Sequence, residues 1–227
     1  MMVQTTTTPA FWIALAAEQR FSDLDYISRS IWDDRDWDTE LQLLMRSAFD
    51  LSRPRRGVLF LDVGANMGFF TLLAAASGWT AIAVEALPAN AHLLRHSLRV
   101  NGFSSRVTVH NRAVGEPGPA GPLCVCRPPG NPTNGILVPL AARRGHPFGG
   151  DDPEDCEAAA RGATLDELVP AGAPVGLMKL DVEGFELPAL RGAGRVLSRQ
   201  RPCGIAVELN PLLMRRNGYT VQVCVCV

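Results

Sequence analysis

The sequence has little excess of either charge and no long hydrophobic run. Its 227 residues carry 22 Lys and Arg against 23 Asp and Glu, a net charge of −1, so the composition favours neither nucleic acid nor an anionic membrane as partner. No apolar run reaches the roughly 20 residues that a membrane-spanning helix needs. No positive charge precedes the apolar patch from Phe11 to Ala17, so a secretory signal is not expected.

Cysteine is present, but not at the spacing of zinc ligands. The six cysteines include two Cys-x-Cys pairs, which is not the usual pattern of a zinc site. Because nothing else in the sequence indicates secretion, we expect all six to be reduced thiols in a cytoplasmic protein. They are Cys124, Cys126, Cys156, Cys203, Cys224 and Cys226.

Two other groups of possible metal ligands are better explained as solvated surface. His92 and His96 are four residues apart on an expected helix, but no third ligand is evident. The segment from Trp32 to Asp38 carries four acids, which could bind a divalent cation. Asp38 is more simply a cap for the helix that follows, so no metal site is predicted.

The chain has enough apolar sequence for one sizeable core. Apolar residues make up 47% of it, and 227 residues suit one domain better than two. We expect a helical preface at residues 1–55, because apolar positions between Thr39 and Phe49 repeat at helical spacing. Residues 56–227 are expected to form the main domain, interrupted by a Pro- and Gly-rich excursion at about 115–160.

Strands and helices alternate through the main domain. Thr164 and Glu167 have the spacing of a capping box, and the excursion is expected to hold a hairpin-like piece and a mobile loop. The alternation is typical of an α/β fold, here Rossmann-like, whose mostly parallel central sheet is flanked by helices. The sequence patterns predict strands at 58–63, 80–84, 106–110, 175–180 and 204–209, and helices at 69–76, 90–100 and 185–197.

A glycine-bearing turn follows the first strand of the main domain. Gly64 and Gly68 let the backbone bend tightly and approach a ligand, and the start of the next helix offers unpaired N–H groups. In open α/β sheets the ligand lies at the carboxyl ends of the strands, so we expect a cofactor at this turn. The turn reads Asp62-Val63-Gly64-Ala65-Asn66-Met67-Gly68.

The acid at the end of the next strand indicates which cofactor. Glu85 follows the turn by about twenty residues, where an acid binds the ribose hydroxyls of a nucleotide. The turn is Gly-x-x-x-Gly rather than the Gly-x-Gly-x-x-Gly of dinucleotide sites, and Asp62 would repel a pyrophosphate. S-adenosylmethionine has no phosphate, and Asp62 is placed to pair with its cationic amino group. The pattern therefore favours S-adenosylmethionine over NAD.

Several longer segments resemble the FkbM family of methyltransferases, over about residues 57–219. The resemblance implies a Rossmann-like methyltransferase fold and, usually, O-methylation of a natural-product, sugar or lipid-linked hydroxyl. The segments are Phe60-Leu61-Asp62-Val63-Gly64-Ala65-Asn66-Met67-Gly68-Phe69-Phe70-Thr71, Val84-Glu85-Ala86-Leu87-Pro88, Ala163-Thr164-Leu165-Asp166-Glu167-Leu168, and Met178-Lys179-Leu180-Asp181-Val182-Glu183-Gly184-Phe185-Glu186 with Leu190-Arg191-Gly192-Ala193 behind it.

These motifs supply the predicted cofactor and catalytic residues. Asp181 or Glu183 would orient the acceptor hydroxyl or take its proton, and Lys179 would pair with Asp181 on one side of the strand. A purely structural ion pair is the alternative, with the acids stabilised at a helix start. The predicted catalytic residues are Lys179, Asp181 and Glu183, and the predicted cofactor-binding residues are Asp62, Gly64, Ala65, Asn66, Gly68, Glu85, Ala86, Asn111 and Asp181.

Other polar residues are candidates for the wall of the site. Asn111 ends the third strand, where it would meet the adenine or simply form a turn. The resemblance places a cofactor- or substrate-facing segment near Asn131 and Asn134 in the excursion. Glu208 and Asn210 close the fifth strand and are expected to line the acceptor side.

The C-terminal end departs from the usual pattern of this fold. Only 17 residues follow Asn210, where the fold usually continues with a helix and an antiparallel strand pair, so we expect a shortened end and an uncovered sheet edge. The leading prediction is an S-adenosylmethionine-dependent methyltransferase acting on a small-molecule acceptor. The alternatives are a truncated, non-catalytic cofactor-binding remnant and a nicotinamide-dependent oxidoreductase.

Overall fold

The computed structural model describes residues 1–16, 26–52, 57–116, 123–127, 134–139, 156–158 and 162–218. A five-stranded sheet in the order β12-β11-β3-β4-β5 forms its centre, and every neighbouring pair in it is parallel. The strands lie close to the expected positions, so the predicted fold class is confirmed. They are β3 (Leu59–Val63), β4 (Thr80–Glu85), β5 (Val107–Asn111), β11 (Val175–Leu180) and β12 (Gly204–Val207).

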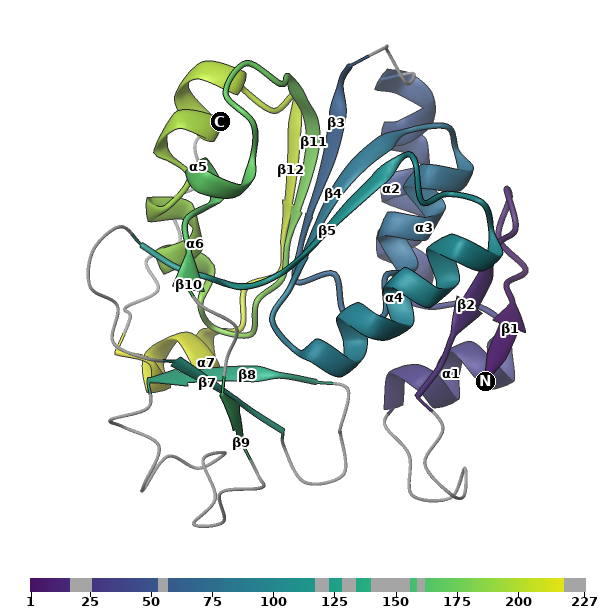
Figure 1. Ribbon diagram of the computed structural model, residues 1–227, viewed down its shortest axis with the longest axis horizontal. Coiled ribbons are helices and arrows are strands. Elements are labelled where there is room, and N and C mark those ends of the chain that lie inside the picture. Colours follow the sequence, from purple (N-terminus) through teal and green to yellow (C-terminus); the bar gives the residue numbers. More distant parts are fainter. Residues whose placement is uncertain are drawn as a thin grey trace.

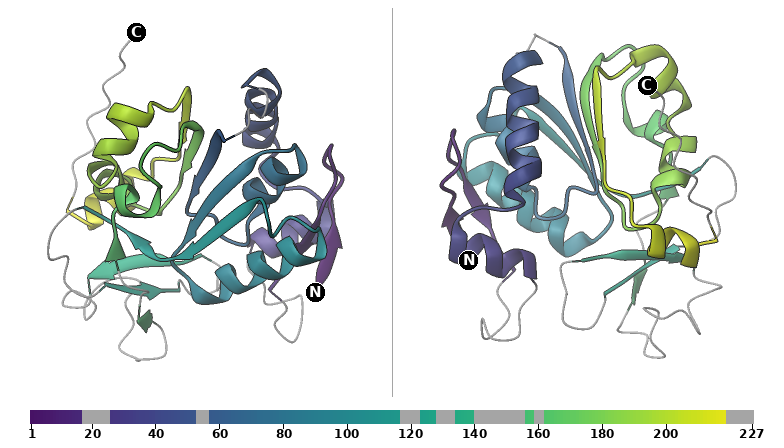
Figure 2. Two further views of the ribbon diagram at one scale, coloured as in Figure 1. Left: turned by 45° about the horizontal axis from the view of Figure 1, so that its top comes forward. Right: turned by 180° about the vertical axis from the view of Figure 1, so that it is seen from behind.

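Helices cover both faces of this sheet (Figure 1). Alternate residues of one strand therefore enter different cores: Phe60 packs with α3 on one face, whereas Leu61 packs with α6 on the other. Figure 2 shows the same two helical layers from two further directions. On one side lie α2 (Thr39–Ser52), α3 (Phe69–Ala76) and α4 (Pro88–Val100), and on the other lie α5 (Leu165–Leu168) and α6 (Glu186–Arg191).

The strand order reverses between β3 and β11. From β3 the chain continues to β4 and β5 on one side, whereas β11 and β12 are added on the other side. The register aligns Asp62 of β3 with Lys179 of β11. The turn after β3 and the motif after β11 thus meet at a switch point, which is where open α/β sheets bind ligands.

The first residues form strands, which corrects the expectation of a wholly helical preface. β1 (Met2–Gln4) and β2 (Trp12–Ala14) pair in antiparallel fashion outside α4. Ser97 Oγ of α4 accepts the N–H of Ala14 at 2.8 Å, and this tertiary bond leaves no trace in the local hydrophobic pattern. The aromatic ring of Phe11 meets that of Phe69 at 5.4 Å, so the segment shares the core of the main domain.

The helical part of the preface agrees with the expectation. It comprises α1 (Tyr26–Asp34) and α2, which lies against α3. The predicted cap of α2 is confirmed, because a carboxylate oxygen of Asp38 accepts the N–H of Leu41 at 3.1 Å. His92 and His96 are both exposed on α4, as expected for a solvated helix face.

The helix predicted at 185–197 is divided in two. α6 ends at Arg191, and a short π-helix (Val196–Gln200) follows it. The carboxylate of Asp166 accepts the N–H groups of Arg195 at 2.7 Å and Val196 at 2.9 Å, so it starts the second piece as a cap would. Asp166 lies within the capping box of α5, which is confirmed with Thr164 and Glu167 as its two members.

A small antiparallel sheet in the order β8-β7-β9 lies beyond the carboxyl ends of the central strands (Figure 1). It consists of β7 (Leu123–Cys126), β8 (Ile136–Pro139) and β9 (Cys156–Ala158), and β7 and β8 are the expected hairpin-like piece. The loop that was predicted to be mobile lies outside the described residues. A short parallel pair, β6 (Ala113–Val114) and β10 (Gly162–Ala163), leads into and out of this region.

Two cysteines of the small sheet correct the prediction of reduced thiols. Cys126 and Cys156 face each other across β7 and β9 and form a disulfide with an S–S distance of 2.07 Å. Cys124 and Cys203 are not disulfide-bonded, and the Sγ atoms of Cys124 and Cys126 are 3.8 Å apart. Cys224 and Cys226 lie outside the described residues.

β12 is the edge strand of the central sheet, and α7 (Pro211–Arg216) follows it. Among the described residues, Ile205 and Val207 of this strand are 42% and 38% exposed. Among the described helices, none combines the length and the apolar character needed to cross a bilayer.

Candidate active site

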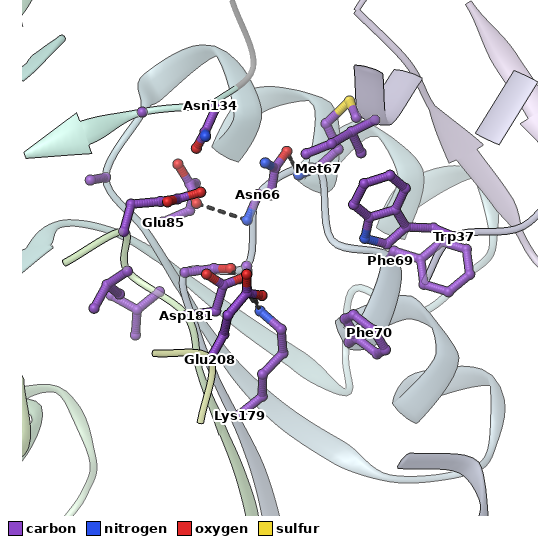
Figure 3. A pocket seen from close by; sticks show the side chains of 18 of the residues that line it. Trp37, Asn66, Met67, Phe69, Phe70, Glu85, Asn134, Lys179, Asp181 and Glu208 are labelled. Atoms are coloured by element: carbon purple, nitrogen blue, oxygen red, sulfur yellow. Dashed lines mark hydrogen bonds and ion pairs between the residues drawn. The ribbon is translucent and has the colours of Figure 1, made fainter. Parts of the chain in front are cut away.

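A cavity of about 260 Å³ lies at the switch point, against the carboxyl ends of the central strands. The turn after β3, the ends of β4, β11 and β12, the small sheet and the N-terminal segment all contribute to its lining. Figure 3 shows Glu85 and Asn134 at one end, Trp37 and Phe70 at the other, and a charged group between them. Residues that are far apart in the sequence therefore share one hollow.

The turn after β3 owes its shape to its two glycines. Gly64 has φ +79°, and a Cβ there would overlap the main-chain carbonyl oxygen of Asp181. Gly68 has φ +93°, and a Cβ there would overlap the side chain of Leu94 in α4. Gly64 and Ala65 line the cavity, whereas Gly68 does not and serves the packing of α3 on α4.

The amide groups at the beginning of this turn already have acceptors. The N–H groups of Gly64 and Ala65 donate to the carbonyl of Val84 at 2.9 and 3.0 Å. The N–H of Asn66 donates to Glu85 Oε2 at 2.8 Å. These hydrogen bonds hold the turn against the end of β4, so the backbone of the turn that faces the cavity is fixed in place.

Glu85, the last residue of β4, is an acid that lines the cavity. Its carboxylate also accepts the N–H of Leu87 at 2.8 Å, so both oxygens are held in place. Burial raises the pKa of Glu85 to about 7, against the lowering effect of the hydrogen bonds from Leu87 and Asn66. A buried acid that lines the cavity at the end of β4 matches the position predicted to bind ribose.

Asn111 and Ala86 hold the loop after β4. Asn111 Nδ2 donates to the carbonyls of Glu85 at 2.8 Å and of Ala86 at 2.9 Å. Ala86 lines the cavity and Asn111 does not, so the side chain of Asn111 shapes the wall from behind. Arg112, the next residue, does line the cavity, and sequence reasoning missed it because no motif singles it out.

Lys179 lies at the centre of a buried charged group. Its Nζ is 3.1 Å from Asp181 Oδ2, 3.9 Å from Asp62 Oδ1 and 3.3 Å from the carbonyl of Gly64. Burial alone would lower the pKa of Lys179, but the carboxylates of Asp181 and Asp62 outweigh it and raise that pKa. Lys179 therefore stays cationic and joins the turn after β3 to the motif after β11.

Asp62 lies behind the turn rather than in the cavity. It is fully buried, its Oδ2 accepts a hydrogen bond from Thr71 Oγ1 at 2.5 Å, and it is absent from the cavity lining. Asp181, with 26% of its side chain exposed, does line the cavity. Of the two acids that flank Lys179, the structure thus presents Asp181 to a ligand.

Two further acids face the same space. Glu183 lines the cavity at φ +51°, and burial and the nearby Asp181 raise its pKa to about 7 while a hydrogen bond from Asn134 opposes the rise. Asp181 is the main cause of the raised pKa of Glu208, the last residue after β12 to line the cavity. Of the expected wall residues, Asn134 and Glu208 are in place.

The remaining candidate residues have structural roles or lie outside the described residues. Asn210 caps α7, where its Oδ1 accepts the N–H of Leu213 at 3.2 Å. Glu186 accepts the N–H of Gly184 at 2.9 Å and closes the turn after β11, as its alternative reading at a helix start implied. Asn131 lies outside the described residues.

Sequence reasoning missed the contribution of the N-terminal segment. Tyr26, Trp37 and Asp38 line the cavity beside Phe70 of α3. Trp37 and Asp38 were noted only as part of an acidic, solvated segment, and no local pattern shows that this segment folds back over the strand ends. The feature of the sequence that could have indicated a place in the cavity is the pair of tryptophans, Trp32 and Trp37, among the acids of this segment.

The chemistry of the lining fits a nucleoside with a short amino-acid tail. Gly64 lines the cavity and lets the turn pack against Asp181, and Glu85 offers a carboxylate for ribose hydroxyls. The described amides of Gly64, Ala65 and Asn66 already donate to Val84 and Glu85, so these three groups are not left over for a pyrophosphate. The residues present thus fit S-adenosylmethionine better than a dinucleotide.

The fold is Rossmann-like, with its cavity at the carboxyl ends of the parallel strands. Residues 62–220 match the model of the methyltransferase FkbM domain, and the chain belongs to this family of S-adenosylmethionine-dependent methyltransferases. The predicted family, fold and cofactor are thereby confirmed, and the nicotinamide-dependent alternative finds no support.

Comparison with other proteins adds little beyond the family. A solved structure similar to this chain is the crystal structure of the SAM dependent methyltransferase from Agrobacterium tumefaciens, with 12% identity and a TM-score of 0.43. The match covers 96% of this chain and 58% of that one, so the present chain spans less than two thirds of that protein's length. No curated protein sequence matches.

Proposed function

We propose that this chain catalyses O-methylation of a small-molecule hydroxyl, with S-adenosylmethionine as methyl donor. The observation that carries the proposal is the cavity that Glu85 lines together with the acids Asp181, Glu183 and Glu208. A donor held at one end would present its methyl group to an acceptor beside these three acids.

In this proposal each part of the cofactor has its own partner. Glu85 accepts hydrogen bonds from the ribose hydroxyls, and Ala65, Asn66 and Ala86 form the wall along the nucleoside. Asp181 faces the charged amino-acid tail, while Asp62 acts only indirectly by holding Lys179 and Thr71. Gly68 and Asn111 likewise shape the site without touching the ligand.

S-adenosylmethionine supplies a methyl group on a sulfonium, a leaving group that is already activated. The protein has to position the acceptor oxygen in line, keep water out and take up the hydroxyl proton. As the new O–CH₃ bond forms, the electron pair of the broken S–CH₃ bond goes to sulfur. Glu183 accepts the proton, because its pKa of about 7 leaves part of it ionised and basic at neutral pH.

Lys179 does not act as the base in this scheme. Its raised pKa keeps it protonated, and its Nζ is occupied by Asp181 and the Gly64 carbonyl. Lys179 is therefore a positioning residue, which pairs with Asp181 and ties the two motifs together.

Calorimetric titration with S-adenosylhomocysteine and with NAD tests the cofactor site. We expect binding of the first and none of the second, and at least about tenfold weaker binding by Glu85→Ala. Glu40→Ala, which changes an exposed acid of α2 outside the cavity, is the matched control. Binding of NAD alone, or full affinity in Glu85→Ala, would contradict the assignment.

Release of S-adenosylhomocysteine in the presence of hydroxyl compounds tests the reaction. We expect a product with one extra methyl group on oxygen, and a strongly reduced kcat in Glu183→Gln with little change in cofactor affinity. Cofactor binding without turnover on any acceptor would instead support the non-catalytic remnant. A product methylated on nitrogen would overturn the oxygen assignment.

A further inference from the structure

One end of the cavity has a different chemistry from the rest. Figure 3 shows Trp37, Phe69 and Phe70 together on the side away from Glu85 and Asn134. Trp37 follows α1, whereas the two phenylalanines begin α3. The ring of Tyr26 meets that of Trp37 edge-on at 5.7 Å and extends this aromatic wall.

The cofactor leaves this end vacant if it binds as proposed. Its ribose is anchored at Glu85, and the adenine joined to that ribose must lie at the same end. Its amino-acid tail is zwitterionic and needs several polar partners, whereas Phe69 and Phe70 supply none and Trp37 supplies a single indole N–H. An aromatic wall beside the turn therefore suits another molecule.

The aromatic end adjoins the charged group directly. Lys179 Nζ lies 5.5 Å from the centre of the Phe70 ring and 3.3 Å from the carbonyl of Gly64. A ring packed on Phe70 and Trp37 would thus lie beside the charged group of Lys179 and Asp181. A hydroxyl on that ring would share one cavity with the methyl donor and with Glu183, the proposed proton acceptor.

The charges around this end discriminate against anions. Among the described residues, five acids and two cations line the cavity: Asp38, Glu85, Asp181, Glu183 and Glu208 against Arg112 and Lys179. Lys179 is already shared between Asp62 and Asp181, and Arg112 follows β5 at the Glu85 end. A carboxylate or phosphate next to Trp37 would meet Asp38, Asp181 and Glu208 without a cation of its own.

Resting on the proposed function, we infer that Trp37, Tyr26 and Phe70 form the acceptor subsite, and that it takes an uncharged alcohol carried on a flat apolar ring. Trp37 stacks with the ring, and Asp38 and Glu208 select against an anionic acceptor. A protonated amine is also excluded as the reacting form, because it has no lone pair with which to attack the methyl group. The N-terminal segment thus determines acceptor specificity.

Three probes with one ring and different charges test this inference: benzyl alcohol, benzoate and benzylamine. Saturation-transfer NMR measures their binding to the whole chain, with and without saturating S-adenosylhomocysteine. We expect saturable binding of benzyl alcohol and at least about fivefold weaker binding by Trp37→Ala, from the loss of one aromatic contact. Trp37→Leu, which keeps apolar volume without the ring, should give the same loss and guards against misfolding.

Two controls separate the subsite from the cofactor site. Trp12→Ala removes a tryptophan that is 41% exposed on β2 and outside the cavity, and should change no affinity. Asp38→Asn keeps an oxygen to cap α2 and suits the backbone there at φ +46°, but removes the charge. Combined with Glu208→Gln, it should raise the affinity for benzoate by at least about tenfold.

The outcomes distinguish failure of this inference from failure of the proposed function. Benzoate binding the parent as tightly as benzyl alcohol would overturn the inference, as would absence of benzyl alcohol binding or methyl transfer from S-adenosylmethionine to benzylamine in preference to benzyl alcohol. Equal loss of S-adenosylhomocysteine affinity in Trp37→Ala would also overturn it, by assigning the aromatic end to the cofactor. Failure of the proposed function would instead appear as absence of S-adenosylhomocysteine binding to the parent chain.

Discussion

The main-chain carbonyl oxygen of Asp181 occupies the place where a Cβ on Gly64 would stand. The two residues are far apart in the sequence but follow adjacent parallel strands, β3 and β11. Their contact joins the cofactor turn to the motif that carries Lys179 and Glu183. Any side chain at position 64 must therefore push the turn after β3 away from the motif after β11.

Gly64→Ala should lose far more stability than its backbone conformation alone explains. Gly102 has φ +71° with nothing within 4 Å of an added Cβ, so Gly102→Ala measures the conformational cost by itself, about 1–2 kcal/mol. We expect Gly64→Ala to lose at least about 2 kcal/mol more in chemical denaturation, and to lose S-adenosylhomocysteine binding. Equal losses in the two variants would show that the contact with Asp181 yields easily.

Glu85 should make the unliganded chain less stable as pH rises. Its folded pKa of about 7 lies above the usual 4.5, so the folded state holds this proton more tightly than the unfolded state. The stability from that proton is complete below pH 4.5 and is lost as pH rises through 7, a change of about 3 kcal/mol. Glu85→Gln should flatten this fall in urea titrations, whereas Glu40→Gln should not.

The same proton should control cofactor affinity. Ribose hydroxyls donate to Glu85 only when it is ionised, so S-adenosylhomocysteine binding should strengthen by about tenfold between pH 6 and pH 8. Calorimetry at several pH values measures this dependence, which Glu85→Gln should remove. A parent affinity that does not change across this range would contradict the assignment of the ribose to Glu85.

Lys179 should stabilise the fold by neutralising Asp62 and Asp181. Its side chain is 6% exposed and that of Asp62 is fully buried, so Lys179→Met leaves buried negative charge unpaired. We expect a loss of about 3–5 kcal/mol in the free energy of unfolding. Adding Asp62→Asn should restore part of it, and an additive double variant would show that the two charges do not interact.

The disulfide between Cys126 and Cys156 should stabilise the chain. It closes a loop with a sequence separation of 30, for which chain entropy allows up to about 3–4 kcal/mol. Reductant, or Cys126→Ser with Cys156→Ser, should lower the thermal midpoint, while Cys203→Ser at an exposed position should not. A parent chain that contains no disulfide by mass spectrometry, or that melts alike with and without reductant, would contradict this prediction.

Much of the fold followed from local patterns. The apolar runs before Asp62 and Lys179 predicted buried parallel strands within one residue of β3 and β11. The Thr164–Glu167 spacing predicted its capping box, and Asp38 its cap, because both depend on neighbours in the sequence. The β1–β2 pair and the break after Arg191 did not follow, since hydrogen bonds accepted by Ser97 and Asp166 from distant residues decide them.

The candidate site, like the fold, was partly predicted from the sequence and partly decided by contacts between distant segments. Sequence alone determined that Gly64, Glu85 and Asp181 end neighbouring strands, because parallel α/β connectivity brings strand ends to one edge. Only the tertiary structure decided that Asp62 faces inward to Lys179 and Thr71, that Cys126 pairs with Cys156, and that Trp37 closes the cavity. These three depend on contacts between distant segments, and such contacts leave no periodic pattern in the chain.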